Sequence, residues 1–544
     1  MPLRRREFIR WAGAAGAAAL APGLGCRIPA PGRRTDGRPN ILFIMADDHA
    51  YQAISCYDGR LNRTPNIDRL ARGGVRFINS FCTNSICAPS RAVLLTGQYS
   101  HRNGIIDNAE AFDGRQTTFP KLLQKAGYRT ALFGKWHLKS DPTGFDHWSI
   151  LPDQGDYYNP DMITMGEQRR RTGYVTDLVT DDALAWLKAR DRDKPFGLLL
   201  HHKAPHRNWM PDAGHLGMYE GERRPIPDTF EDDYATRSAA ARDQEMRVAD
   251  HLTLGYDLKL EPDATPADDT PVEALIRKEW DGIMARLSPD ERRVFSEAYR
   301  RDNEEYRRAG LQGRALAEWK YQRYIRDYLR CIASVDDNVG RVLDFLETEG
   351  LAENTVVVYT SDQGFYLGEH GWFDKRFMYE ESLRMPLIVR YPREIKPGVN
   401  DRDMVLNLDF AETFLDYAGV AAPAEMQGRS MRGILRGETP TDWRQSIYYH
   451  YFEYPAVHSV KRHYGVRTRR YKLIHFYFDI DAWELYDLEK DPRELHNVYE
   501  DPSHFGVARD LKAELERLRR LYGDTDETKF LPNRRPGDPV RGDD

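Results

Sequence analysis

The chain contains 544 residues, 41% of them hydrophobic, so it can bury a large core and form more than one structural unit. Its 79 Lys and Arg residues stand against 85 Asp and Glu residues, which gives a formal net charge of −6. Neither sign of charge forms a long block, and the bulk charge therefore argues against nucleic acid as the partner.

The first 36 residues (1–36) have the pattern of a targeting segment. Three arginines (Arg4–Arg6) precede an apolar run (11–24) rich in Ala and Gly, which is typical of a twin-arginine leader. The alternative is a basic start to a short core helix. The run is too short to span a bilayer, and no later stretch is long and apolar enough, so we expect export to the periplasm without a membrane span. Cys26 is a candidate for lipid attachment, although Gly23 stands where a lipobox normally has Leu.

Four apolar runs after the leader end at polar residues. They are residues 40–46 before Asp47 and Asp48, 130–134 before Lys135 and His137, 195–200 before His201 and then His206, and 355–361 before Asp362 and Gln363. Such runs are typical of buried parallel strands in α/β proteins. One such polar residue alone is more often a cap or a solvated loop residue. Because parallel strands present their carboxyl ends at one edge of a doubly wound sheet, the repetition predicts a shared site there.

The remaining segments predict how the chain is divided. Residues 212–318 are charged and indicate a mostly helical insertion, and the apolar spacing over 321–347 predicts a helix packed on the sheet. Strand-like sequence follows from Met385. Alternating aromatic and polar residues after position 441 predict a small antiparallel sheet. The expected order is a leader (1–36), an N-terminal α/β domain (37–440), a C-terminal subdomain (441–532) and a disordered tail (533–544) rich in Pro, Gly, Arg and Asp.

The most informative segment is Cys-Ala-Pro-Ser-Arg-Ala-Val-Leu-Leu-Thr-Gly at 87–97. Pro89 suits the first turn of a helix and Gly97 suits its end, so Cys87 is expected at a helix N-terminus. Free N–H groups and the helix dipole there favour an anionic substrate and a reactive thiol. The alternative is a buried cysteine before an ordinary helix. A thiol phosphatase of the usual form is excluded, because its loop places Arg where this chain has Val93.

The other cysteines beyond the leader give no sign of a metal knuckle. These cysteines are Cys56, Cys82 and Cys331. They form no C-x-x-C pair with one another or with Cys87. Neither a zinc knuckle nor a disulfide scaffold is therefore indicated.

The motif Cys-x-Pro-Ser-Arg at Cys87, followed by Leu-Thr-Gly, resembles the signature of the type I sulfatases of the alkaline phosphatase superfamily. Matching segments span nearly the whole chain after the leader: NILFIMADD from Asn40, TPNIDRLARGGVRF from Thr64, GKWHL from Gly134, KAPH from Lys203, SDQGFYLGEHG from Ser361, DKRFMYEESLRMPLIVRYP from Asp374 and ELYDLEKDPRELHNV from Glu484. The resemblance implies an α/β fold with an alkaline phosphatase-like sheet sandwiched by helices. It also implies a smaller C-terminal α+β subdomain that contains an antiparallel sheet.

The resemblance further implies that a maturation enzyme oxidises Cys87 to formylglycine, whose hydrate carries two hydroxyls. The implied metal ligands are Asp47, Asp48, Asp362 and Gln363, completed by position 87 and a substrate oxygen. A set made only of oxygen atoms, with three carboxylates, suits Ca²⁺ rather than zinc. Relatives more often have Asn or His in place of Gln363, but an amide oxygen on a longer arm can still coordinate a metal.

The resemblance also assigns the catalytic roles. Arg91 and Lys135 hold and polarise the hydrate, and Lys375 binds sulfate oxygens opposite the metal. One hydroxyl of the hydrate attacks sulfur while His206 gives a proton to the leaving alcohol, and His137 takes the proton of the second hydroxyl. His201 and His202 lie near these residues in the sequence. A structural role at the end of the strand fits them at least as well as a catalytic role.

The segment from Tyr448 resembles the C-terminal region of bacterial sulfatases related to N-acetylglucosamine-6-sulfatases. Candidate sugar-binding residues in it are His458, Arg462 and His463, although alternating aromatics can simply pack the subdomain. We therefore expect hydrolysis of sulfate esters of a sulfated glycan, with 6-O-sulfate on a terminal N-acetylglucosamine or similar hexosamine as the hypothesis. One alternative is a phosphonate monoester or phosphodiester hydrolase of the same superfamily. The other is a sulfated-glycan binding protein without catalytic activity.

Overall fold

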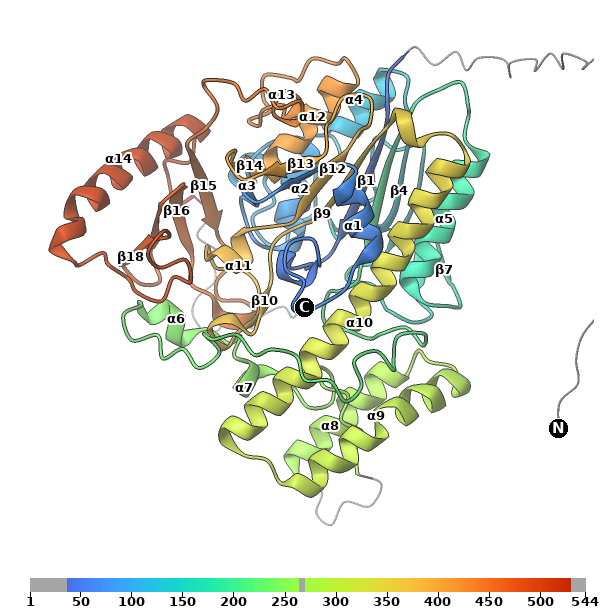
Figure 1. Ribbon diagram of the computed structural model, residues 1–544, viewed down its shortest axis with the longest axis vertical. Coiled ribbons are helices and arrows are strands. Elements are labelled where there is room, and N and C mark those ends of the chain that lie inside the picture. Colours follow the sequence, from blue (N-terminus) through green and yellow to red (C-terminus); the bar gives the residue numbers. More distant parts are fainter. Residues whose placement is uncertain (1–36, 264–269, 530–544) are drawn as a thin grey trace, which may run out of the picture.

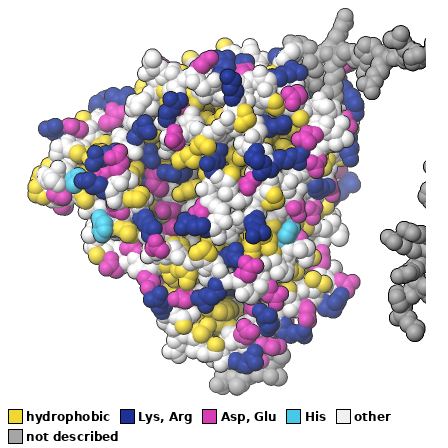
Figure 2. All heavy atoms as spheres, in the orientation of Figure 1, with side chains coloured by type: hydrophobic (Ala, Val, Ile, Leu, Met, Phe, Trp, Pro, Cys, Tyr) yellow, Lys and Arg dark blue, Asp and Glu magenta, His cyan; other side chains and the backbone are white. Residues whose placement is uncertain are grey.

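The computed structural model describes residues 37–263 and 270–529 (Figure 1). The predicted leader with Cys26 and the predicted tail lie outside the described residues. Within the described part of the chain, none of the helices combines the length and apolar character needed to cross a bilayer. On the face shown in Figure 2, basic and acidic side chains are interspersed, as the mixed charge pattern of the sequence predicted.

A ten-stranded mixed sheet forms the centre of the molecule, in the order β13-β2-β12-β9-β1-β8-β4-β5-β6-β7. Its four central strands are parallel neighbours, namely β9 (Thr355–Ser361), β1 (Asn40–Ala46), β8 (Phe196–His202) and β4 (Arg129–Lys135). These are the four apolar runs recognised in the sequence. Their carboxyl ends meet at one edge of the sheet, as predicted.

Both faces of the sheet are covered by helices. In β1, Ile41 and Phe43 belong to one buried cluster and Leu42 and Ile44 to the other, which follows from the two-residue period of a strand. One face packs against α2 (Cys87–Thr96), α4 (Phe119–Lys125) and α12 (Phe410–Tyr417), and the other against α1 (Pro65–Arg72), α5 (Val175–Ala189) and α10 (Gly313–Thr348). The helix predicted over 321–347 lies within α10 and packs on the sheet, as expected.

The outer elements complete this layered domain. The strands are β2 (Val75–Phe77), β3 (Ser80–Phe81), β5 (His147–Leu151), β6 (Asp161–Thr164), β7 (Glu167–Arg170), β10 (Tyr366–Leu367), β11 (Phe373–Asp374), β12 (Leu387–Arg390), β13 (Gly398–Asn400) and β14 (Val405–Leu406). The short helices are α3 (Ser100–Asn103), α11 (Glu380–Leu383) and α13 (Arg432–Leu435). The strand-like segment from Met385 contains β12.

The insertion is less helical than the sequence suggested. Residues 212–238 form turns, because this stretch contains several prolines and glycines that interrupt helices. The helices follow as α6 (Ala239–Asp243), α7 (Val248–His251), α8 (Pro271–Met284) and α9 (Pro289–Ala309). Ser288 and Glu291 form a capping box at the start of α9. In Figure 1, α8 and α9 form the lower part of the molecule.

The second sheet confirms the antiparallel prediction. Its strands are β15 (Ser446–Tyr451), β16 (His463–Thr468), β17 (Tyr471–Phe476) and β18 (Ala482–Asp487), paired in that order. The helix α14 (Phe505–Tyr522) packs on it through buried leucines. The C-terminal segment thus joins the same buried cluster as α2.

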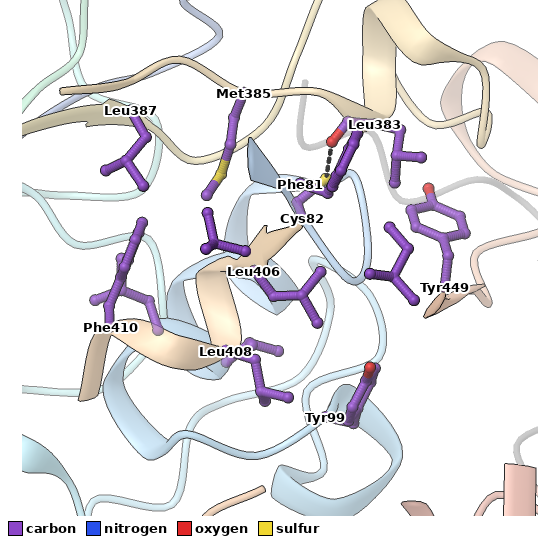
Figure 3. Close-up of a cluster of buried hydrophobic side chains, with 14 of the residues drawn as sticks. Phe81, Cys82, Tyr99, Leu383, Met385, Leu387, Leu406, Leu408, Phe410 and Tyr449 are labelled. Carbon is purple, nitrogen blue, oxygen red and sulfur yellow. Dashed lines mark hydrogen bonds between the residues drawn. The ribbon is translucent and has the colours of Figure 1, made fainter. Parts of the chain in front are cut away.

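An apolar cluster lies behind the start of α2 (Figure 3). It brings together Phe81, Leu406 and Phe410 with Tyr449 of β15. Within it, the Cys82 thiol donates to the Leu383 carbonyl at 3.5 Å, and burial raises the pKa of this thiol to about 12. Cys82 is therefore an inert packing residue, and the cluster fixes the segment that leads into Cys87.

Candidate active site

Cys87 is the first residue of α2, as predicted. The helix ends at Gly97, whose φ of 62° is left-handed and whose N–H donates to the Val93 carbonyl at 2.8 Å. At the other end, the Ala88 N–H donates to the Asn108 side chain at 3.0 Å. The position of residue 87 is thus fixed from both ends of the helix.

The Cys87 thiol is fully buried among charged groups. Its Sγ lies 3.6 Å from Asp47 Oδ1 and 3.9 Å from Lys135 Nζ. Burial, followed by the Asp47 carboxylate, raises the pKa of this thiol well above its usual range. Burial thus favours the protonated thiol, and the reactivity expected from the helix N-terminus stays a prediction.

Three carboxylates converge beside Cys87. Asp47 and Asp48 follow β1 and Asp362 follows β9, and these strands pair in parallel register up to Ala46 and Ser361. One oxygen of each carboxylate lies within 4.8 Å of the others, and all three side chains are buried. This arrangement follows directly from the parallel register of the two strands.

Three cations balance these carboxylates. The Arg91 guanidinium lies 3.0 Å from Asp362 and 3.5 Å from Asp47, Lys375 Nζ lies 2.9 Å from Asp48, and Lys135 pairs with Asp47. Although burial opposes it, Lys135, His206 and Arg91 hold the pKa of Asp47 well below its usual range. Burial raises the pKa of Asp48 to about 6, and burial together with Asp47 raises the pKa of Asp362 to about 8. Burial is the largest cause of both increases, because it removes water from the two carboxylates.

Gln363 supplies the fourth candidate oxygen. Its Nε2 donates to Asp48 Oδ1 at 2.5 Å and lies 3.9 Å from Cys87 Sγ, while its Oε1 is buried without a hydrogen-bond partner. Turning the amide by half a turn places the oxygen where the nitrogen now lies, facing the carboxylates. Three carboxylates and one amide oxygen form a set of oxygen donors that fits a divalent cation. The described residues thus include an Asp-rich group that could bind a metal.

The two histidines that are predicted to act as general acid and general base are both buried beside charged groups. His206 Nε2 is 3.6 Å from Asp48 Oδ2, and its Nδ1 is 2.7 Å from the Arg207 carbonyl, which fixes Nδ1 as the donor in the neutral ring. Burial, and then Lys135, lower the pKa of His206 well below its usual range. His137 Nε2 is 3.3 Å from Asp153, and burial lowers the pKa of His137 to about 4.

His201 and His202 lie in β8 and do not join the acidic group. His201 Nδ1 is 3.2 Å from the Lys135 carbonyl, and its ring packs edge-on against Phe43. Burial lowers the pKa of His202 to about 3. The contacts of His201 favour the structural interpretation of this residue.

The sequence did not single out several neighbours of the site. Gln154 accepts from Lys135 Nζ at 2.5 Å, and Asp374 and Arg376 flank Lys375 and bond to each other at 3.0 Å. The residues beside Lys375 could have been found from the run Asp-Lys-Arg. Gln154 gave no such signal, because its contact with Lys135 depends on the path of the loop after β5.

The three candidate sugar residues fall in different places. His458 lies near Lys375, with Nε2 at 3.4 Å from Asp374 Oδ2 and Nδ1 bonded to the Glu245 carbonyl. The contacts of the other two favour the structural interpretation. Arg462 bonds Asp479 and the carbonyls of Phe452 and Tyr454. His463 is fully buried, and backbone groups of Met378 and Lys461 occupy both of its ring nitrogens, so its side chain has no polar group left for a sugar.

Comparison with known families agrees with this geometry. The profile described as Sulfatase matches residues 39–420, and the one described as N-sulphoglucosamine sulphohydrolase, C-terminal, matches residues 368–521. This chain belongs to the sulfatase family. The sulfatase is 50% identical over 501 residues to an N-acetylglucosamine-6-O-sulfatase of Bacteroides thetaiotaomicron, covering 91% of this chain and 89% of the relative. It is a hydrolase of sulfate esters in the alkaline phosphatase superfamily.

Solved structures confirm the fold of the sulfatase. One is described as being in complex with its substrate D-glucosamine-2-N,6-O-disulfate, and it superimposes with a TM-score of 0.87 at 50% identity, covering 90% of this chain and 99% of that chain. A phosphonate monoester hydrolase from Silicibacter pomeroyi gives a TM-score of 0.65 at 22% identity, covering 90% and 97%. The second likeness shows the alkaline phosphatase-like fold alone.

Proposed function

We propose that this sulfatase removes 6-O-sulfate from a terminal N-acetylglucosamine or closely related glucosamine unit of a sulfated glycan. The observation that carries the proposal is the 50% identity to an N-acetylglucosamine-6-O-sulfatase, which extends over about nine-tenths of both chains. The similar structure that holds D-glucosamine-2-N,6-O-disulfate supports the same sugar class. Lys375, with Asp374, Arg376 and His458 beside it, provides polar groups on the side where the sugar would lie.

The cofactors in this proposal are a formylglycine made from Cys87 by a maturation enzyme and a calcium ion. Asp47, Asp48, Asp362 and Gln363 would hold the ion. When present, the hydrated aldehyde supplies a hydroxyl nucleophile and Ca²⁺ supplies a positive charge that polarises oxygen atoms of the sulfate ester. The convergence of the three buried carboxylates and the orphaned Gln363 Oε1 support a cation at this point.

The residues of the chain then have separate tasks. Arg91 and Lys135 contact the same carboxylates as residue 87 and hold that side chain in place, and Lys375 binds sulfate oxygens on the opposite side. His206 Nε2 faces the centre and gives a proton to the oxygen of the leaving alcohol. Because burial lowers the pKa of His206, the negative charge of bound sulfate is needed to keep that proton on the ring. His137, beside Asp153, would accept the proton of the second hydroxyl at position 87, so that the C–O bond to sulfate breaks, sulfate leaves and the aldehyde forms again.

Export belongs to the same proposal. The twin-arginine pattern at Arg4–Arg6 indicates transport of the folded protein to the periplasm, with lipid attachment at Cys26 as a further hypothesis. Oxidation of Cys87 would precede folding, since the folded protein buries this residue completely. Maturation in the cytoplasm and calcium binding after export are compatible with this order.

The substrate class is tested with a panel of defined esters. We expect 6-O-sulfated N-acetylglucosamine and 6-O-sulfated N-sulfoglucosamine to be hydrolysed with kcat/KM at least about a hundredfold above 2-O-sulfated sugars, phosphonate monoesters and phosphodiesters, because only the right ester places sulfur beside residue 87. Sulfate release measured by ion chromatography decides the comparison. Preference for 2-O-sulfate or N-sulfate would reject the proposed sugar position.

Calcium should stabilise the folded protein measurably. Adding Ca²⁺ to chelator-treated protein is expected to raise Tm progressively with concentration, because a ligand that binds only the folded state stabilises it by about 2.7 kcal/mol at a hundred times its Kd. Differential scanning calorimetry checks this. Asp362→Asn should weaken the shift, whereas Asp153→Asn, outside the acidic group, should retain it. Wild-type protein with no calcium-dependent shift would contradict the calcium assignment.

A further inference from the structure

A pocket of about 370 Å³ opens beside His206. Its inner end is lined by Gln154, Lys203 and His206, and its outer wall is formed by α8 of the insertion. Gln154 bonds Lys135 at 2.5 Å, and His206 lies 3.6 Å from Asp48. The pocket therefore connects the catalytic residues with the insertion.

Four cations line this pocket, and the protein neutralises two of them. Arg207 makes a bidentate pair with Asp257 at 2.7 and 2.8 Å. Arg286 follows α8 and pairs with Asp156 at 2.9 Å and with Asp161 at 2.8 Å, which holds this end of the helix against β6 and the loop before it. These two arginines thus build the pocket and have no charge to offer a ligand.

The two lysines of the pocket are different. Within the described residues, neither Lys203 nor Lys278 lies within 4 Å of a carboxylate or forms a side-chain hydrogen bond. Lys203 is only 3% exposed, and its ammonium lies 4.9 Å from the Tyr157 ring. The one other acid of the lining, Glu279, accepts from the backbone N–H groups of Gly255 and Tyr256. A buried ammonium without an anion is unfavourable, so this end of the pocket is prepared for a negatively charged group.

The outer wall is kept open by a glycine within a helix. Gly282 lies inside α8, where glycine costs about 1 kcal/mol relative to alanine. A Cβ added at Gly282 would meet nothing within 4 Å, so no neighbouring atom requires a glycine there. On the same wall Leu275 is 50% exposed, and Tyr157 and Tyr256 add aromatic surface. Apolar surface, aromatic rings and unpaired cations are what a charged saccharide needs for binding.

We propose that this pocket is a second subsite of the sulfatase, which binds an anionic group of the saccharide other than the sulfate that is hydrolysed. Lys203 binds that group at the inner end and Lys278 at the mouth. The inference rests on the proposed glycan function. The anionic group is either an N-linked sulfate on the same sugar or a carboxylate or sulfate on the attached sugar. All of these groups are oxyanions, which lysine binds.

The test compares three substrates. They are 6-O-sulfated N-acetylglucosamine, the same sugar with N-sulfate in place of the acetyl group, and 6-O-sulfated N-acetylglucosamine linked to a uronic acid. Lys278→Glu is expected to lower kcat/KM about tenfold for a substrate that carries the second anion and to leave the singly charged sugar within about twofold. Arg293→Glu makes the same charge change on an exposed position of α9 outside the pocket and is expected to leave all three unchanged.

A second variant tests whether the pocket must stay open for the substrate that carries the second anion. Gly282→Phe should place a ring in the pocket and lower kcat/KM about tenfold for the same substrate, with a small aryl sulfate unaffected. Gly282→Ala, which adds only a methyl group, should behave like the wild type. Circular dichroism verifies that both variants are folded.

The outcomes separate the possibilities. A loss with the N-sulfated monosaccharide assigns the subsite to the same sugar, and a loss only with the uronic acid conjugate assigns it to the attached sugar. Equal losses on all substrates, or no loss in either variant, would overturn the subsite while leaving the glycan activity intact. A wild-type enzyme that cleaves the aryl sulfate and none of the sugars would instead overturn the proposed function itself.

Discussion

Replacing Cys87 with alanine is expected to lower kcat/KM for every sulfate ester by about 10⁴-fold or more, because the variant cannot form a nucleophile at this position. The fold should remain, since residue 87 begins a helix that is fixed by Asn108, Val93 and the apolar cluster behind it. Kinetics with an aryl sulfate and calorimetric unfolding check the two halves of this prediction.

The thiol itself gives the reason to expect a modified residue. Burial and the neighbouring carboxylate raise the pKa of Cys87, so the unmodified side chain is a protonated thiol and a poor nucleophile. Mass spectrometry of the native protein is therefore expected to find an aldehyde at position 87. Cys56→Ser changes a half-buried cysteine that does not belong to the acidic group, and as the matched control it should keep full activity. Undiminished turnover by Cys87→Ala would end the formylglycine mechanism.

The acidic centre could be predicted because each of its residues ends an apolar run. Asp47, Asp48 and Asp362 follow neighbouring parallel strands, and a parallel register brings the ends of such strands together without further information. Cys87 was predicted from another local pattern, a helix that begins at this residue and ends at a glycine. Local patterns were sufficient wherever the regular geometry of a strand or helix positions the side chain.

The sugar side of the site depends on contacts that no local pattern encodes. His458 lies beside Asp374 and the Glu245 carbonyl because a C-terminal loop returns over residues more than eighty positions earlier. His463 has the same residue type and lies five positions away, yet Met378 and Lys461 bond both of its nitrogens. Composition alone cannot tell these two histidines apart, since the difference comes from which backbone groups each ring meets.

The insertion shows the same limit for whole elements. Its charged sequence predicted helices, but the position of α8 over the active site depends on Arg286, which pairs with Asp156 and Asp161 about 125 residues earlier in the chain. The pocket beside His206 is a consequence of that long-range contact. The insertion thus reaches the catalytic residues.

The second large effect is expected for His206→Ala, and its size should depend on the leaving group. An alkoxide leaving from a sugar needs a proton in the transition state, and a positioned general acid contributes about 10²–10⁴-fold to such a step. A nitrophenolate is stable as an anion and needs little help. We therefore expect kcat/KM to fall about a thousandfold for the 6-sulfated sugar and less than about tenfold for 4-nitrophenyl sulfate.

The geometry supports this division. His206 Nδ1 is committed to the Arg207 carbonyl, which leaves Nε2 to face Asp48 and the reacting centre. His215→Ala, a histidine paired with Asp212 away from the site, serves as the control and should leave both substrates unchanged. A histidine that merely held Asp48 in place would affect both esters equally when removed. Equal losses on the sugar and on the aryl sulfate would therefore assign His206 a positioning role, and the general acid would have to be sought among the other groups that line the pocket, with Lys203 as the next candidate.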